Sequence, residues 1–79
     1  MDRIDQTLDL RGLNCPLPVL KARKALAGMP AGARLELLTS DPKAPADLAE
    51  LCAAAGHRLL ASERGADGDR VVIERGPGR

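Results

Sequence analysis

In the stretch "NCPLPVLKARKAL" (residues 14–26), a cysteine and two prolines stand directly before a basic, helix-like segment. Proline is well tolerated in the first turn of a helix, where the N–H group that it lacks would have no intrahelical partner. We therefore predict a helix over residues 16–27 with Cys15 as its N-cap. Its buried face is predicted to carry Val19, Ala22 and Leu26.

In this position Cys15 is expected to be exposed and reactive. The positive end of a helix favours a thiolate over a thiol, and cysteines there have pKa values of roughly 3.5 to 7.5 instead of about 8.5. Pro16 and Pro18 would hold the sulfur rigidly, and Leu17 between them adds no negative charge. Such a thiolate can attack another sulfur atom and then carry it as a persulfide. The alternative is that Cys15 is a small buried hydrophobic residue, which is the commoner role of an isolated cysteine.

Four basic residues stand close to this cysteine in the sequence, namely Arg11, Lys21, Arg23 and Lys24. They would add positive charge near the sulfur and form a docking surface for an acidic partner, where charges mainly set encounter rate and specificity. A solvated helix face is the alternative. Gly12, in the loop before the motif, is expected to support the turn, because glycine tolerates positive φ.

Outside this segment, strand patterns alternate with a second helix pattern. The expected strands are residues 4–10 (with the second half better formed), 34–39, 57–64 and 70–75, the last two joined by a hairpin at Asp67-Gly68. A second helix is expected to start at Pro45 and to stop at Gly56. The order βαβαββ predicts an α/β (α+β) two-layer sandwich, with two helices on one face of a mixed four-stranded sheet and the other face partly open. Strands joined by a helix are expected to pair in parallel.

The composition limits the classes of function. The chain has 79 residues, so we expect a single domain over residues 1–79, and it has no aromatic residue on which a base could stack. With a net charge of +1 as well, no direct nucleic-acid binding is expected. Two cysteines and one histidine lack the spacing of a zinc site, so no metal and no other cofactor is expected. A charged N-terminus and the lack of a long apolar run predict no membrane association and a cytoplasmic protein with free thiols.

Three other residues have a chemical and a structural interpretation, and we favour the structural one for each. Cys52 falls on the apolar stripe of the second helix, which predicts packing. His57, the only histidine, is expected to make a hydrogen bond at the start of the third strand rather than to act as a base. Asp9 is expected to anchor the following loop.

The segment "LDLRGLNCPLP" (residues 8–18) resembles the TusA/SirA-like family of small sulfur-carrier proteins, whose signature is Cys-Pro-x-Pro at the start of the first helix. The resemblance covers nearly the whole chain, including Asp41-Pro42 and Asp47. It implies that a cysteine desulfurase or another sulfurtransferase hands sulfur to Cys15, which passes it to an acceptor protein. The acceptor would serve tRNA thiolation, molybdenum-cofactor assembly, sulfur oxidation or selenium metabolism. Leu17 departs from the glutamate that is frequent in relatives that serve tRNA thiolation.

Two functions from different classes are therefore predicted. The first is a sulfur carrier, monomeric when free, that transfers sulfur rather than acting as a stand-alone multi-turnover catalyst. The second is a non-catalytic regulatory module that binds protein or RNA through the open sheet face or the basic helix surface, since a fold alone does not fix function. A thioredoxin-like oxidoreductase is disfavoured, because no resolving cysteine stands near Cys15.

Overall fold

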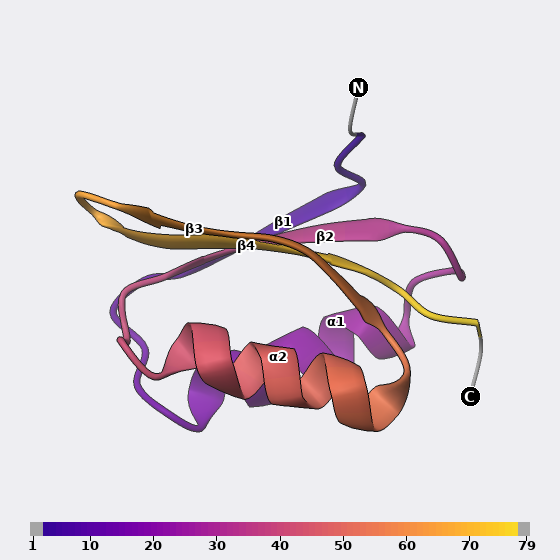
Figure 1. The fold of residues 1–79 in the computed structure, drawn as a ribbon, viewed down its shortest axis with the longest axis horizontal. Coiled ribbons are helices and arrows are strands. Elements are labelled where there is room, and N and C mark those ends of the chain that lie inside the picture. The colour runs from indigo at the N-terminus through magenta and orange to yellow at the C-terminus, as the bar shows by residue number, and fades with distance from the viewer. Residues whose placement is uncertain (1–2, 78–79) are drawn as a thin grey trace.

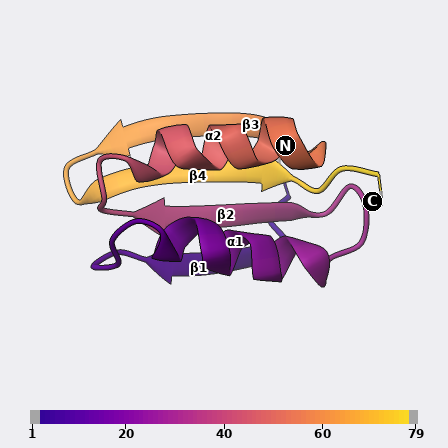
Figure 2. The same ribbon diagram turned by 90° about the horizontal axis from the view of Figure 1, so that it is seen from below.

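A computed structural model describes residues 3–77 of the chain. The elements are β1 (Gln6–Leu10), α1 (Leu17–Ala27), β2 (Arg34–Thr39), α2 (Ala44–Ala55), β3 (Arg58–Gly65) and β4 (Gly68–Glu74). Both helices lie on the same side of a four-stranded sheet (Figure 1). Seen from the helix side, α1 lies over β1 and β2, and α2 lies over β4 and β3 (Figure 2). The predicted two-layer sandwich with the order βαβαββ is confirmed.

The strand order is β1-β2-β4-β3, which corrects part of the predicted pairing. β1 and β2 pair in parallel as expected, but β4 lies antiparallel between β2 and β3, so the two strands joined by α2 do not pair. Burial explains this order. The run of residues 71–73 in β4 is buried throughout, as suits an interior strand, whereas β3 is exposed along most of its length, as an edge strand can be. The hairpin turn also lies one residue earlier than predicted, because Gly65 pairs with Gly68 and the turn consists of Ala66 and Asp67.

The core lies between the sheet and the helices. β2 contributes Leu35 and Leu37, whose buried side chains alternate with half-buried ones along the strand, and the predicted bounds 34–39 are confirmed. Most of the other core side chains come from β4 and from the inner faces of α1 and α2: Val71, Ile73, Ala22, Leu26, Leu48, Leu51 and Cys52. Leu10 of β1 and the α1–β2 connection, through Met29 and Ala33, complete the cluster. Cys52 is 3% exposed, so its predicted packing role is confirmed.

Both helices differ from their predicted starts by one residue. Pro16, and not Cys15, is the N-cap of α1, because the first helical hydrogen bond runs from Leu20 N–H to the carbonyl of Pro16. The N–H of Leu17 instead closes a turn onto the carbonyl of Asn14, at 2.9 Å. In α2 the first residue is Ala44, and Pro45 follows it. Cys15 therefore belongs to the loop before α1.

The sheet face away from the helices is open, as predicted, but it is covered by paired charges. Arg70 contacts Glu36 and also Glu63, the latter at 3.3 Å between Nη1 and Oε1. Glu74 lies 3.8 Å from Arg34 and 3.6 Å from Arg58. This face therefore presents alternating and largely balanced charge. None of the helices within residues 3–77 has the length and hydropathy to cross a membrane.

Candidate functional site

Cys15 lies where three connections meet at one end of the molecule. The β1–α1 loop, the β2–α2 loop and the β3–β4 hairpin are all at this end (Figures 1 and 2). The thiol is exposed and borders an open groove of about 440 Å³ between the two helices. This exposure rules out the alternative that Cys15 is a buried packing residue.

Two hydrogen bonds fix the loop that carries Cys15 to the loop before α2. The carboxylate of Asp41 accepts the backbone N–H of Cys15 at 2.6 Å and that of Lys43 at 3.0 Å. Ser40 Oγ accepts the N–H of Gly12 at 2.7 Å, and Gly12 has a φ of +90°, a conformation that favours glycine. The two loops thus hold the cysteine backbone in place.

The charge around the sulfur is opposite to the prediction. The Cys15 thiol donates a hydrogen bond to Asp47 Oδ2, with Sγ and Oδ2 3.5 Å apart. This hydrogen bond, partial desolvation, and the negative charges of Asp47 and Asp41 raise the pKa of Cys15, while Lys43 opposes them. The predicted low pKa is therefore wrong for the free protein.

The helix end fails to lower this pKa for a structural reason. Two backbone N–H groups at the start of this segment are already engaged, since Cys15 N–H binds Asp41 and Leu17 N–H binds Asn14. A hydrogen bond favours ionisation of a thiol only when it is donated to the sulfur, whereas here the thiol itself is the donor. Asp41 and Asp47 stand 26 and 32 residues from Cys15 in the sequence, so their proximity has no local signal.

The four basic residues predicted for partner docking are not gathered around the sulfur. Arg23 lines the same groove as Cys15. Lys21 and Lys24 line a different groove, beside Gln6 of β1. Arg11 lies at a hollow formed with the β3–β4 hairpin. The structure thus divides the predicted docking set among three places.

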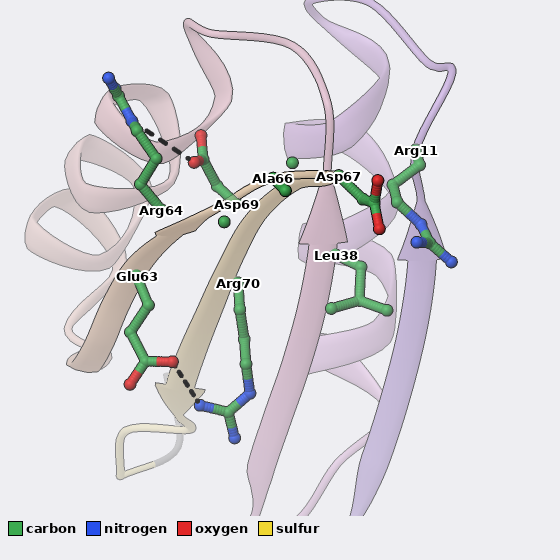
Figure 3. Close-up of a pocket in the computed structure, with 10 residues that line it drawn as sticks. Arg11, Leu38, Glu63, Arg64, Ala66, Asp67, Asp69 and Arg70 are labelled. Carbon is green, nitrogen blue, oxygen red and sulfur yellow. Dashed lines mark hydrogen bonds and ion pairs between the residues drawn. The ribbon is translucent and has the colours of Figure 1, made fainter.

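The hollow at Arg11 has a volume of about 290 Å³. Figure 3 shows two of its arginines paired with carboxylates, Arg64 with Asp69 and Arg70 with Glu63. Arg11 binds Asp9 through two hydrogen bonds of 2.8 Å, which, with the Arg11 N–H, lower the pKa of Asp9 to about 2. Arg64 lies 3.7 Å from Asp69. The hydrogen bonds that Asp9 accepts from the backbone N–H and the side chain of Arg11 confirm its predicted loop-anchoring role. Because its cations are paired, the hollow has little capacity to attract an anion.

Two exposed leucines near Cys15 were not identified as functional candidates from the sequence. Leu17 and Leu20 are 43% and 49% exposed, although leucine is usually buried. They stand three residues apart on the outer face of α1, near Lys21 and Lys24. In the helical repeat both leucines fall opposite the buried stripe of Ala22 and Leu26, and this placement could have identified them from the sequence.

His57 has the structural role that was predicted. Its Nδ1 accepts the backbone N–H of Gly76 at 2.9 Å, and burial together with the charge of Arg75 lowers the pKa of the imidazole. It follows the C-terminal end of α2, whereas Asp47 and Cys15 lie at the N-terminal end of this 12-residue helix. A helix of that length spans about 18 Å, so His57 is not a base for Cys15. Within residues 3–77, no cluster of three or more His, Cys, Asp or Glu side chains could hold a metal ion.

Comparison with known proteins identifies the family. Residues 6–75 match the family described as sulfurtransferase TusA. The chain belongs to this family. It is 52% identical over 60 residues to a Neisseria meningitidis serogroup A protein whose name describes it as a candidate sulfur carrier, covering 75% of this chain and 81% of that protein. It is 40% identical over 63 residues to the sulfur carrier protein TusA of Allochromatium vinosum, covering 80% and 83% of the two chains.

The TusA family assignment extends to the fold. The crystal structure of a SirA-like protein from Desulfitobacterium hafniense superimposes with a TM-score of 0.80 at 29% identity, covering 90% of this chain and 97% of that one. The family resemblance seen at the Cys-Pro-x-Pro motif is confirmed. Family membership supports the sulfur-carrier function over the non-catalytic binding module.

Proposed function

We propose that the protein carries sulfur as a persulfide on Cys15 and relays it from a donor protein to an acceptor protein. The observation that supports this best is the exposed thiol of Cys15 in a chain of the sulfurtransferase TusA family. The backbone of Cys15 is fixed by a hydrogen bond at the end of the molecule where the two helices begin. The proposal treats residues 1–79 as one carrier domain. It also assumes a reducing, cytoplasmic compartment, because a relay thiol must not be lost to a disulfide.

The chemistry is a thiol exchange without net oxidation. The Cys15 thiolate attacks the outer sulfur of a donor persulfide, and a bond forms between Sγ and that sulfur. The sulfur–sulfur bond of the donor breaks, and its electron pair leaves on the donor cysteine as a thiolate. Delivery to the acceptor repeats the step in the other direction, with Cys15 as the leaving thiolate.

Partner docking is proposed on the outer face of α1. Leu17 and Leu20 offer exposed apolar surface on α1. The same helix supplies positive charge from Arg23 in the Cys15 groove and from Lys21 and Lys24 in the groove beside β1. A donor such as a cysteine desulfurase or another sulfurtransferase, and a downstream acceptor, would match this face with apolar and acidic side chains. Arg11 would contribute least, because Asp9 already balances its charge. Gly12, Pro16 and Pro18 would act by shaping the loop.

Intact mass measurement tests the persulfide. The protein is incubated with a cysteine desulfurase and cysteine, and we expect the mass of one added sulfur atom in the wild type and in Cys52→Ser. The Cys15→Ser variant should gain none. An unchanged mass in the wild type, or a gain retained by Cys15→Ser, would contradict the proposal.

The non-catalytic module remains the second candidate, and its readout differs. If the basic helix surface alone carried the function, Lys21→Glu combined with Lys24→Glu would abolish it and Cys15→Ser would leave it intact. The paired charges of the open sheet face disfavour the RNA-binding form of this candidate, because the arginines there already have carboxylate partners.

A further inference from the structure

The carboxylate of Asp47 faces the sulfur from the first turn of α2. The distance of 3.5 Å between Sγ and Oδ2 makes Asp47 the hydrogen-bond acceptor of the thiol. An ionised sulfur in the same position would have no proton to donate and would meet a full negative charge. The contact therefore exists only for the protonated form of Cys15.

Other charges near the sulfur do not reverse this preference. Asp47 of α2 and Asp41 and Lys43 of the β2–α2 loop act on the sulfur directly. Glu50 of α2 and Arg23 of α1 line the same groove as Cys15. Three carboxylates thus stand against two cations. Asp47 is the member of this set that makes a hydrogen bond with the thiol itself.

We propose that Asp47 is a positioning residue that holds Cys15 as a neutral thiol in the free carrier, and that a cationic group of the docked sulfur donor releases it by pairing with Asp47. This inference rests on the proposed carrier function. It specifies the donor surface as one that brings a lysine or arginine side chain beside its persulfide. Attack on small sulfur compounds in solution is slow in the free protein, because they supply no such cation.

The absence of aromatic side chains makes the ionisation of Cys15 directly measurable. Thiolates absorb in the ultraviolet, and no tryptophan, tyrosine or phenylalanine obscures the signal. Subtracting the titration curve of Cys15→Ser from that of each protein removes the contribution of Cys52. The variants are Asp47→Asn, the charge-retaining Asp47→Glu, and Glu50→Gln, which removes another carboxylate of the same groove.

We expect Asp47→Asn to shift the ionisation midpoint of Cys15 to lower pH and to raise the thiolate population at neutral pH about fourfold, the factor that Coulomb's law in water with salt screening gives for a unit charge 3.5 Å from the sulfur. Alkylation by iodoacetamide should rise less, about twofold to threefold, because a more acidic thiol is a weaker nucleophile. Asp47→Glu should stay close to the wild type, and Glu50→Gln should shift less than Asp47→Asn. An unchanged midpoint in Asp47→Asn, or an equal shift in Glu50→Gln, would overturn the role of Asp47.

The second half of the proposal concerns the donor. Inorganic polysulfide serves as the small donor: the thiolate attacks its terminal sulfur, a new sulfur–sulfur bond forms on Cys15, and the shortened polysulfide leaves with the electron pair. Asp47→Asn should load faster than wild type from polysulfide but no faster from a desulfurase. Equal acceleration with both donors would refute release by docking. Both outcomes are distinct from failure of the carrier function, in which the wild type gains no sulfur from either donor.

Discussion

Replacing Gly68 by alanine tests how closely the start of β4 packs against the end of β2, directly before the loop that binds the Cys15 backbone. A Cβ atom at position 68 would lie 2.2 Å from the carbonyl oxygen of Thr39 and 3.2 Å from its carbonyl carbon. Gly68 also has a backbone φ of +129°, a value that L-residues with a side chain rarely adopt. Overpacking costs about 1–3 kcal/mol and a strained backbone a similar amount, so we expect a loss of about 3 kcal/mol in the free energy of unfolding.

Thermal unfolding measured by far-ultraviolet circular dichroism provides the assay, since the chain lacks the aromatic residues that fluorescence requires. For a domain of this size about 3 kcal/mol corresponds to a fall in Tm of about 12 to 24 °C. Gly28→Ala is the matched control, because its φ is −93° and the nearest atom to its Cβ is 3.8 Å away. If the two variants unfolded at the same temperature, the close contact between the hairpin and Thr39 would be refuted.

Three more predictions follow from buried and exposed groups. Thr39→Val should raise the free energy of unfolding by about 1 kcal/mol in urea titrations. The reason is that it removes a buried hydroxyl that has no hydrogen-bond partner among residues 3–77. A loss of stability would contradict this. The pKa of His57 is lowered in the fold. As the pH drops below about 6.5, the unfolded chain therefore takes up a proton before the folded protein does, and the free energy of unfolding falls. His57→Gln should flatten this pH dependence in urea titrations across that range. Leu20→Asp should slow sulfur transfer from a desulfurase about tenfold, whereas Leu60→Asp, an equivalent change on β3, should leave the rate unchanged; equal effects would disprove docking on α1.

The parts of the fold that the sequence predicts correctly depend on short-range patterns. The bounds of β2 follow from its alternation, with Leu35 and Leu37 facing the helices. The inner stripe of α2, including Cys52, follows from helical spacing. The position of β4 between β2 and β3 depends instead on a competition among strands for the buried centre, which no single segment reveals.

In the candidate site too, some features follow from short-range sequence patterns and others depend on long-range contacts. The thirteen consecutive residues 14–26 predict Cys15 as the reactive residue, its exposure and the helix that follows it. Asp41 and Asp47 reach the cysteine only through the sheet and α2, which bring residues 26 and 32 positions away into contact. A prediction of thiol acidity from the motif alone includes the helix end and omits these carboxylates.

Magnitudes decide which of these influences prevails at Cys15. The end of a helix acts as roughly half a positive charge, and this effect falls off within one turn. Asp47 brings a full negative charge to 3.5 Å from the first turn of α2, and Asp41 adds another from the β2–α2 loop. Lys43 opposes them but does not reverse the direction of the pKa shift. A thiol in this setting is exposed yet held protonated, so its reactivity depends on a charge that the partner brings. That dependence would let a carrier with one unshielded cysteine distinguish its donor from other sulfur compounds in the same compartment.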